Sequence, residues 1–182
     1  MEKHLIQKAK DGDSKSVEML YKHFYGYAMS IALRYSNSRD DACEIVNDSF
    51  MKVFDKLPQY SPDNSFKGWF RRILINTSID YYRKNVKYFA VMNIDKADTE
   101  VSDPDIIDRL SSQDILGILR DLPEILRIVF NMYEIEGYSH NEIGDELGIP
   151  PSTSRTYLAR AKKLLREKVQ ELNEIKNEGA IR

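Results

Sequence analysis

Apolar side chains recur every three or four residues along almost the whole chain, and this spacing is the strongest constraint on its fold. Over residues 38–57 the apolar and small residues follow the i, i+3, i+4, i+7 series of a helix that buries one face. Residues 65–84 repeat the pattern, and no alternation of apolar and polar residues competes with it. The sequence therefore predicts an all-α fold.

The exception to this periodicity is the segment 91–108, which contains a proline and six acidic residues. Weak periodicity and charge of one sign are typical of a linker. We therefore expect a helical domain over residues 1–90, an acidic linker over 91–110, a second helical domain over 111–175 and a polar tail over 176–182. A length of 182 residues, with 42% of them hydrophobic, has room for one or two small cores.

Several classes of site and location are disfavoured by what the sequence lacks. Cys43 has no partner for an intramolecular disulfide, and three scattered histidines give no zinc spacing. No apolar run approaches the roughly 20 residues that span a bilayer, and the N-terminus does not resemble a signal peptide. No nucleophile–base pair, phosphate loop or cofactor motif is present. We expect a cytoplasmic protein that is not an enzyme, binds no metal or cofactor and does not insert into membranes.

Residues 139–165 contain the most informative local pattern. Ser139 and Glu142 form a capping box at the start of a short helix. Gly148 permits the left-handed backbone of a tight turn, and Pro151 suits the first position of the next helix. This order of elements predicts a helix-turn-helix, a motif that places its second helix in the major groove of DNA.

The second helix of this motif carries side chains suited to the major groove. Arginine can form two hydrogen bonds to a guanine edge, and small side chains at Ser152, Ser154 and Ala159 permit close approach. The expected DNA contacts of this helix are Ser152, Thr153, Arg155, Thr156, Ala159, Arg160 and Lys163. The alternative that the spacing leaves open is a helical hairpin with a solvated outer face.

A second basic stripe lies on the predicted helix 65–84. The side chains that share one of its faces are Trp69, Arg72, Asn76, Asp80 and Arg83. Aromatic and cationic side chains together suit single-stranded nucleic acid, and the polar loop 60–65 is a candidate pocket for a flipped base. The alternative is that Asn76 and Asp80 hold the arginines in a network within the helix.

The outward face of the predicted helix 38–57 is acidic and contains a methionine. Its members are Glu44, Asn47, Asp48, Met51 and Asp55. A methionine among acids suits an adaptable interface with a basic partner protein. Solvated charge explains the same pattern equally well, and the spacing leaves both interpretations open.

Four stretches of the chain, in order, resemble the extracytoplasmic-function sigma factors, the smallest promoter-recognition subunits of bacterial RNA polymerase. They are AKDGDSKSVEMLYKHFY, DACEIVNDSFMKVFDKL, SFKGWFRRILINTSIDYYRK and LRDLPEILRIVFNMYEIEGYSHNEIGDELGIPPSTSRTYLARAKKLLR. The pattern W-x-x-R-I-x-x-N-x-x-x-D-x-x-R, followed by a helix-turn-helix after a Leu-Pro start, makes the resemblance specific. The stretches cover nearly everything except the linker and the tail.

The resemblance implies a division of function between the domains. Residues 1–90 would be sigma region two, residues 111–175 would be sigma region four, and the linker would lie along the RNA exit path. The residues implied at the clamp helices of the polymerase are Glu44, Asn47, Asp48 and Met51. Those implied to bind and open the minus-ten element are Asp63, Asn64, Ser65, Phe66, Lys67, Trp69, Arg71, Arg72, Asn76 and Arg83.

The resemblance also implies partners. The recognition helix would bind the minus-thirty-five element as duplex, while the other surface of its domain meets the polymerase flap. Core RNA polymerase, duplex and melted promoter DNA and an anti-sigma factor are the expected partners, and the free protein is expected to be a monomer. The alternatives are a stand-alone helix-turn-helix regulator, which would usually dimerise on a palindromic site, and a helical protein-binding adaptor.

Three positions depart from the usual pattern of the family. Asn47 stands where Gln is usual, Gly144 where Ala is usual, and Ser154 where a buried Val is usual. Glycine within a helix costs up to about 1 kcal/mol relative to alanine, so we expect a modestly stable C-terminal domain. The small side chain of Ala159 means that the promoter sequence cannot be inferred from relatives.

Overall fold

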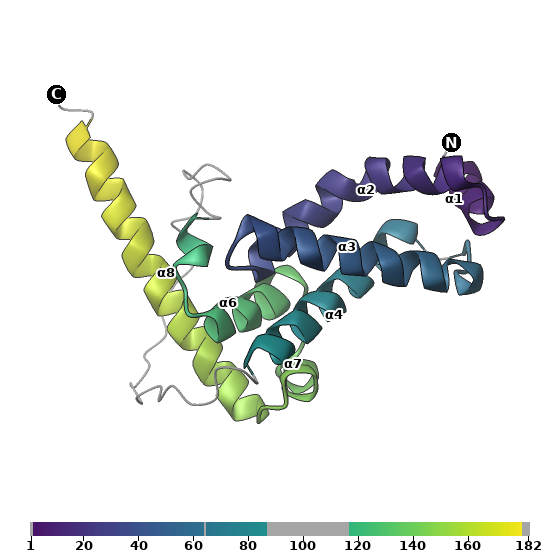
Figure 1. The fold of residues 1–182 in the computed structure, drawn as a ribbon. Coiled ribbons are helices and arrows are strands. Elements are labelled where there is room, and N and C mark those ends of the chain that lie inside the picture. Colours follow the sequence, from purple (N-terminus) through teal and green to yellow (C-terminus); the bar gives the residue numbers. More distant parts are fainter. Residues whose placement is uncertain (1, 64, 87–116, 180–182) are drawn as a thin grey trace. The chain divides into compact units, whose positions relative to one another are not determined.

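In the computed structural model, which describes residues 2–63, 65–86 and 117–179, every regular element is a helix (Figure 1). The all-α expectation is therefore confirmed for these residues. The chain divides into two compact units, Met1–Tyr88 and Phe89–Arg182. The expected acidic linker, residues 91–110, lies outside the described residues. None of the described helices has the length and apolar character needed to cross a membrane.

The first unit is built from four α-helices and one short 3₁₀ helix. They are α1 (Glu2–Lys10), α2 (Ser14–Tyr35), α3 (Arg39–Lys56), the 3₁₀ helix η1 (Leu57–Gln59) and α4 (Phe66–Val86). Helices α2, α3 and α4 pack against one another, and α1 packs on α2 and touches η1 (Figure 1). The unit is thus a three-helix core with one additional helix along its side.

Short polar side chains begin two of these helices. The carboxylate of Asp13 accepts a hydrogen bond of 2.9 Å from the backbone N–H of Ser16 and caps α2. Ser38 and Asp41 form a capping box at the start of α3. The second carboxylate oxygen of Asp41 accepts a 2.8 Å hydrogen bond from the hydroxyl of Tyr81 on α4. The cap of α3 therefore also ties this helix to α4.

Four phenylalanines fill the centre of the first unit. Phe24 comes from α2, Phe50 from α3, and Phe66 and Phe70 from α4, and each is buried. The ring centroids of Phe24 and Phe66 lie 5.0 Å apart, and those of Phe50 and Phe70 lie 4.9 Å apart, with tilted planes. Aromatic pairs at this separation stabilise a core beyond the area that they bury. This cluster fixes which faces of α3 and α4 remain at the surface.

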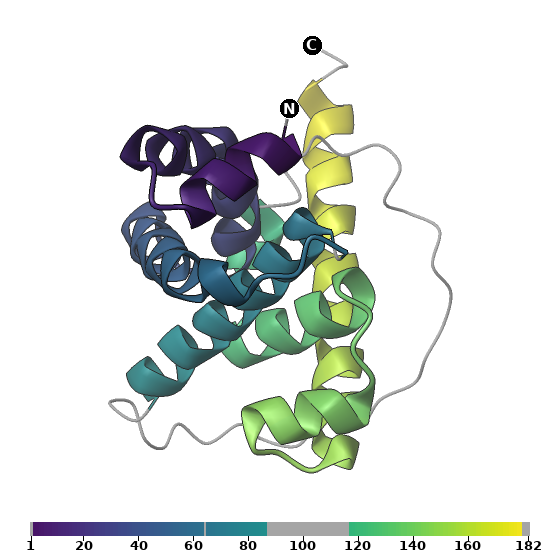
Figure 2. The ribbon, with the colours of Figure 1, turned by 90° about the vertical axis from the view of Figure 1, so that its right-hand side faces the viewer.

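The second unit contains the predicted helix-turn-helix. After a helical turn at 117–120 it consists of α6 (Glu124–Phe130), a π-helix η3 (Asn131–Ile135), α7 (His140–Leu147) and α8 (Pro151–Gly179). Its core includes Leu119, Leu122, Leu126 and Ala161. Figure 2 shows α8 as one unbroken helix. It extends into the segment expected as a polar tail and ends at Gly179.

The turn between α7 and α8 has the predicted geometry. Ser139 and Glu142 form the capping box of α7. Gly148 ends that helix with φ of 67°, and the backbone N–H groups of Gly148 and Ile149 both donate to the carbonyl of Gly144. α8 then begins at Pro151. The helix-turn-helix expectation is confirmed, because each local signal produces the predicted element.

The expected cost of Gly144 must be corrected. A Cβ atom at this position would lie 2.7 Å from the backbone carbonyl oxygen of Ile149 and 3.6 Å from the ring of Pro151. Real Cβ atoms do not approach backbone oxygen so closely, so an alanine would push the turn away from α7. In this chain the glycine permits a close approach of the turn, and its low helix propensity is offset by that contact.

We predict that Gly144→Ala destabilises the C-terminal domain by about 1–3 kcal/mol, because overpacking outweighs the better helix propensity. The unfolding transition of that domain in differential scanning calorimetry measures the change. Gly26→Ala is the matched control, since Gly26 is exposed within α2 and nothing lies within 4 Å of an added Cβ. It should stabilise by about 0.5–1 kcal/mol. A stabilising Gly144→Ala would contradict the packing described above.

Candidate nucleic-acid and polymerase interfaces

The outward face of α3 is available to a partner. Glu44, Asn47, Asp48 and Met51 are all exposed, and 64% of the Met51 surface is open to solvent. We call these four residues the acidic face of α3. Neither acid forms an ion pair within the described residues, and the amide oxygen of Asn47 accepts a 3.2 Å hydrogen bond from Tyr21 on α2. An exposed methionine beside uncompensated carboxylates suits an apolar and basic partner surface.

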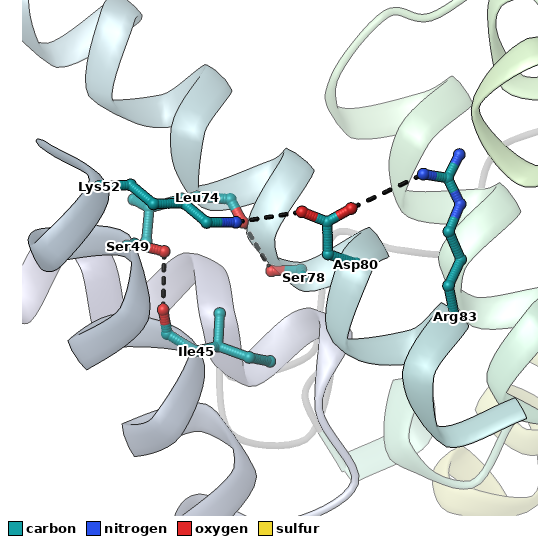
Figure 3. A network of polar contacts seen from close by, with 7 residues as sticks. All are labelled: Ile45, Ser49, Lys52, Leu74, Ser78, Asp80 and Arg83. Atoms are coloured by element: carbon teal, nitrogen blue, oxygen red, sulfur yellow. Dashed lines mark hydrogen bonds and ion pairs between the residues drawn. The ribbon is translucent and has the colours of Figure 1, made fainter. Parts of the chain in front are cut away.

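A polar network links α3 to the basic stripe of α4 (Figure 3). The ammonium of Lys52 on α3 lies 3.0 Å from one carboxylate oxygen of Asp80, and the guanidinium of Arg83 lies 3.6 Å from the other. The predicted Asp80–Arg83 contact within α4 is therefore confirmed. Arg72 has no such partner among the described residues, so the second half of the expected network is wrong. Lys52 was missed, because its position on another helix leaves no trace in the pattern of α4.

Two buried serines lie where α3 and α4 are joined. Ser49 donates to the carbonyl of Ile45 at 2.6 Å, and Ser78 donates to that of Leu74 at 2.8 Å (Figure 3). Each hydroxyl is satisfied within its own helix, so neither requires a partner across the contact. These small side chains allow the helix that carries the acidic face to pack closely on the helix that carries the basic stripe.

The expected minus-ten residues lie on the loop before α4 and along that helix. Asp63, Ser65, Lys67, Arg72, Asn76 and Arg83 are exposed, Trp69 and Arg71 are half-buried, Phe66 is buried, and Asn64 lies outside the described residues. Phe66 is only 3% exposed and belongs to the phenylalanine cluster. The expectation that it contacts DNA must be corrected, because its ring supports the loop from inside.

The loop before α4 is held at both ends. At its start, the buried ring of Tyr60 packs on Trp69 at 5.1 Å, and its backbone carbonyl accepts a 3.0 Å hydrogen bond from Lys10 on α1. At its end, the hydroxyl of Ser65 accepts from the backbone N–H of Gly68 at 3.3 Å and caps α4. The Trp69 ring is thus partly used for packing, and Lys10 is a support that sequence reasoning missed.

Lys67 is oriented by an aromatic ring. Its ammonium lies 4.6 Å from the centroid of Tyr27 on α2, within the range of a cation–π contact. This contact restricts the side chain while leaving the residue exposed, so its charge remains available to a phosphate group. The role of Tyr27 could not be read from the helical pattern, because the two residues are forty positions apart.

The recognition helix presents most of its predicted residues to solvent. Ser152, Arg155, Thr156 and Lys163 are exposed, and Thr153, Ala159 and Arg160 are half-buried. The hydroxyl of Thr156 donates to the carbonyl of Ser152 at 3.1 Å. Ser154 does not share this surface: its residue is fully buried, so the expectation that it eases the approach of DNA must be corrected.

A polar contact behind the recognition helix was not predicted. Nδ1 of His140, the first residue of α7, lies 2.9 Å from the hydroxyl of Ser154. The ring of Tyr133, on the π-helix, stacks on His140 with centroids 4.4 Å apart and planes 21° from parallel. Burial lowers the pKa of His140 below its ordinary value, and the nearby charges of Arg155 and Lys162 lower it further.

Comparison with known protein families matches both units. A sequence model of sigma-70 region 2 matches residues 20–88, and one of sigma-70, region 4 matches residues 112–165. The two matches occur in this order and together span most of the chain. The first covers most of α2 and all of α3 and α4, and the second includes the helix-turn-helix.

Comparison with individual proteins agrees with these matches. The chain is 26% identical over 180 residues to the ECF RNA polymerase sigma-E factor of Escherichia coli (strain K12), with 92% of this chain and 94% of that protein aligned. The corresponding protein of Haemophilus influenzae is 23% identical over 180 residues, covering 92% and 95%. A solved structure, the sigma factor RpoE with the anti-sigma factor NepR from Bartonella quintana, is 20% identical with a TM-score of 0.51. It covers 86% of this chain and 98% of that chain, and the likeness concerns the fold.

The pKa of His140 predicts a pH dependence of stability. Because the folded state disfavours the imidazolium, the unfolded chain binds the proton first as the pH falls below about 6.5. The free energy of unfolding of the C-terminal domain should therefore decrease as the pH is lowered from 7.5, and this decrease should end below the lowered pKa. Urea denaturation between pH 7.5 and 5 measures it, and His140→Phe should remove this part of the pH dependence. An equally steep decrease in the variant would assign the effect to other groups.

Proposed function

The chain belongs to the extracytoplasmic-function sigma factors of the sigma-70 family, and from this we propose how its domains share the work of starting transcription. A sigma factor binds core RNA polymerase, directs it to promoters and promotes the melting of promoter DNA, and this is the function of the chain. The observation that carries the assignment is the match to region 2 followed by region 4, each on a helical unit of its own.

We propose that residues 111–175 act as region four and bind the minus-thirty-five element as duplex. The support is a recognition helix whose exposed side chains include a cation, Arg155, and hydroxyls at Ser152 and Thr156. Arginine reads guanine through two hydrogen bonds in the major groove, whereas hydroxyls and lysines chiefly contact phosphates. Arg155 is therefore the proposed specificity contact, and Lys163 the proposed phosphate contact.

We propose that residues 1–90 act as region two and hold the melted minus-ten strand. Its exposed cations, Lys67, Arg72 and Arg83, lie on α4, and the polar loop that precedes the helix is anchored at Tyr60 and Ser65. Cations along a helix attract the phosphates of a single strand, and a fixed loop costs less ordering entropy when it receives an unpaired base. Residues 91–110 are the proposed linker along the RNA exit path.

The acidic face of α3 is the proposed contact for the clamp helices of the polymerase. Among the described residues no cation pairs with its carboxylates, so association with a basic surface gives electrostatic attraction without breaking such an ion pair. Met51 supplies a polarizable apolar contact at the C-terminal end of the face. The surface of region four that faces away from DNA is the proposed contact for the flap.

We also propose regulation by an anti-sigma factor. The solved relative is in complex with one, and a protein that covers the acidic face or the recognition helix would prevent assembly with polymerase. Sigma factors as a class are not enzymes, and we propose that this chain acts by binding alone, as a monomer when free and without a cofactor. Its partners place the proposed site of action in the bacterial cytoplasm.

The clamp assignment predicts the effect of charge reversal. The double variant Glu44→Lys, Asp48→Lys should lose co-migration with bacterial core RNA polymerase in size-exclusion chromatography, because two attractive contacts become repulsive. The matched control is Glu2→Lys, Asp11→Lys, which changes the net charge equally at exposed acids outside the proposed interfaces. Wild-type protein that is folded and does not co-migrate would refute the sigma function. Co-migration of the first variant would refute only the placement on α3.

The recognition assignment predicts a loss of sequence preference. Arg155→Ala should weaken binding of the holoenzyme to its selected duplex by about 1–3 kcal/mol and relax the base preference at one position. Selection from a library randomised over the upstream element measures the preference. Arg166→Ala, which removes a cation later in α8, is the control and should leave the preference unchanged. Identical preferences in wild type and Arg155→Ala would contradict the assignment.

A further inference from the structure

The inside of the helix-turn-helix is polar at one point where an apolar contact is usual. Ser154 is completely buried, and its hydroxyl forms a 2.9 Å hydrogen bond with Nδ1 of His140. Hydrogen bonds depend strongly on direction, whereas apolar contacts chiefly require proximity. The pair therefore restrains the rotation of one helix relative to the other in a way that a valine could not.

The position of this pair matters for DNA recognition. Ser154 is in the first turn of α8, and the next residue, Arg155, is exposed about 100° further round the helix. His140 is the first residue of α7. A rotation of α8 that lengthened the hydrogen bond would also move the guanidinium of Arg155 across the groove.

Two further contacts hold His140 itself in place. The ring of Tyr133 stacks on the imidazole at 4.4 Å, and Tyr133 belongs to the π-helix that follows α6. A π-helix turns its side chains to positions that a regular helix would not reach, and such irregularities are frequent at functional sites. The ion pair between Glu134 and Lys162, with its atoms 2.7 Å apart, joins the same π-helix to α8. The imidazole is thus placed from one side by stacking and directed to Ser154 on the other.

The close approach at Gly144 and the His140–Ser154 hydrogen bond restrain different aspects of the packing of α7 and α8. The contact between Gly144 and the carbonyl of Ile149 sets the distance of the turn from α7. Gly144 lies in the second half of α7, whereas His140 is its first residue. One contact fixes the separation of the two helices at the turn, and the other fixes the orientation of the first turn of α8.

We propose that His140 is a positioning residue for promoter recognition. Through its hydrogen bond to the buried Ser154, His140 holds the recognition helix at the angle that Arg155 requires. This inference rests on the proposed function of region four. It assigns to His140 and Ser154 no contact with DNA. Loss of the hydrogen bond therefore weakens sequence-specific binding, and non-specific binding, which depends on phosphate contacts, is retained.

The chain offers a matched pair of substitutions at Ser154. Ser154→Thr and Ser154→Val add side chains of the same shape to the same buried site, and only threonine keeps the hydroxyl. Both variants, as full-length chains assembled with core RNA polymerase, are compared on duplex DNA selected by the wild-type holoenzyme and on duplex of scrambled sequence. The affinity for each duplex is measured over a range of salt concentrations.

The expected result is a selective loss. Ser154→Val should reduce the affinity for the selected duplex by about three- to tenfold relative to Ser154→Thr, the effect of one hydrogen bond. The affinity for scrambled duplex and the slope with salt should be the same for both, since the phosphate contacts are unchanged. Equal specific affinities for the two variants would overturn the proposal. A parallel fall on both duplexes would also overturn it, because that result indicates general destabilisation.

A second substitution keeps the test decisive if Ser154→Val fails to fold. His140→Phe preserves a ring for Tyr133 and removes the nitrogen that bonds Ser154. It should produce the same selective loss, and the double variant with Ser154→Val should lose no more than either single variant. Additive losses would overturn the proposal.

If the wild type shows no preference for any duplex, the proposed function of region four fails. A preference lost in Arg155→Ala and kept in both His140→Phe and Ser154→Val refutes the positioning role alone.

Discussion

Four phenylalanines from three helices meet at the centre of the N-terminal domain, and the orientation of its functional faces follows from that contact. Because α3 buries Phe50 and α4 buries Phe70, the opposite side of each helix is left to solvent. The same core therefore determines that the acidic face of α3 and the basic stripe of α4 are exposed. Asp80 joins the two at the surface, where an exposed ion pair adds little stability and chiefly orders the side chains that it touches.

The C-terminal domain combines two kinds of constraint on a short motif. A backbone approach at Gly144, which tolerates no side chain, sets the spacing of the turn. A directional hydrogen bond between His140 and Ser154 sets the angle of the helix that follows. Apolar burial alone would define the spacing of the turn and the angle of α8 less sharply, since apolar side chains can often repack at a small cost in free energy. Polar and steric contacts thus give this small domain a precision that its limited core does not provide.

The features predictable from sequence are those determined by neighbours in the chain. The caps at Asp13 and Ser38, the left-handed turn at Gly148 and the start of α8 at Pro151 depend on only a few adjacent residues. The features that were missed depend on residues far apart in sequence. Lys52 bonds Asp80 and Lys10 bonds Tyr60 across helix contacts, and no periodicity marks an exposed lysine for such a role. Phe66 was assigned to DNA by the resemblance, although its spacing placed it on the buried face, and Ser154 was assigned because a small side chain in the recognition helix does not show how deeply it is covered.

The continuity of α8 has a mechanical consequence. The helix runs for 29 residues, which corresponds to about 43 Å at 1.5 Å per residue. A rod of that length behaves as a lever, and a tilt of about 5° around its midpoint displaces each end by about 2 Å, enough to break a hydrogen bond. A tilt imposed at the C-terminal end of α8 therefore also displaces its N-terminal end, which carries the proposed DNA contacts. A partner that tilted α8 from its C-terminal end would displace Arg155 without itself contacting the groove.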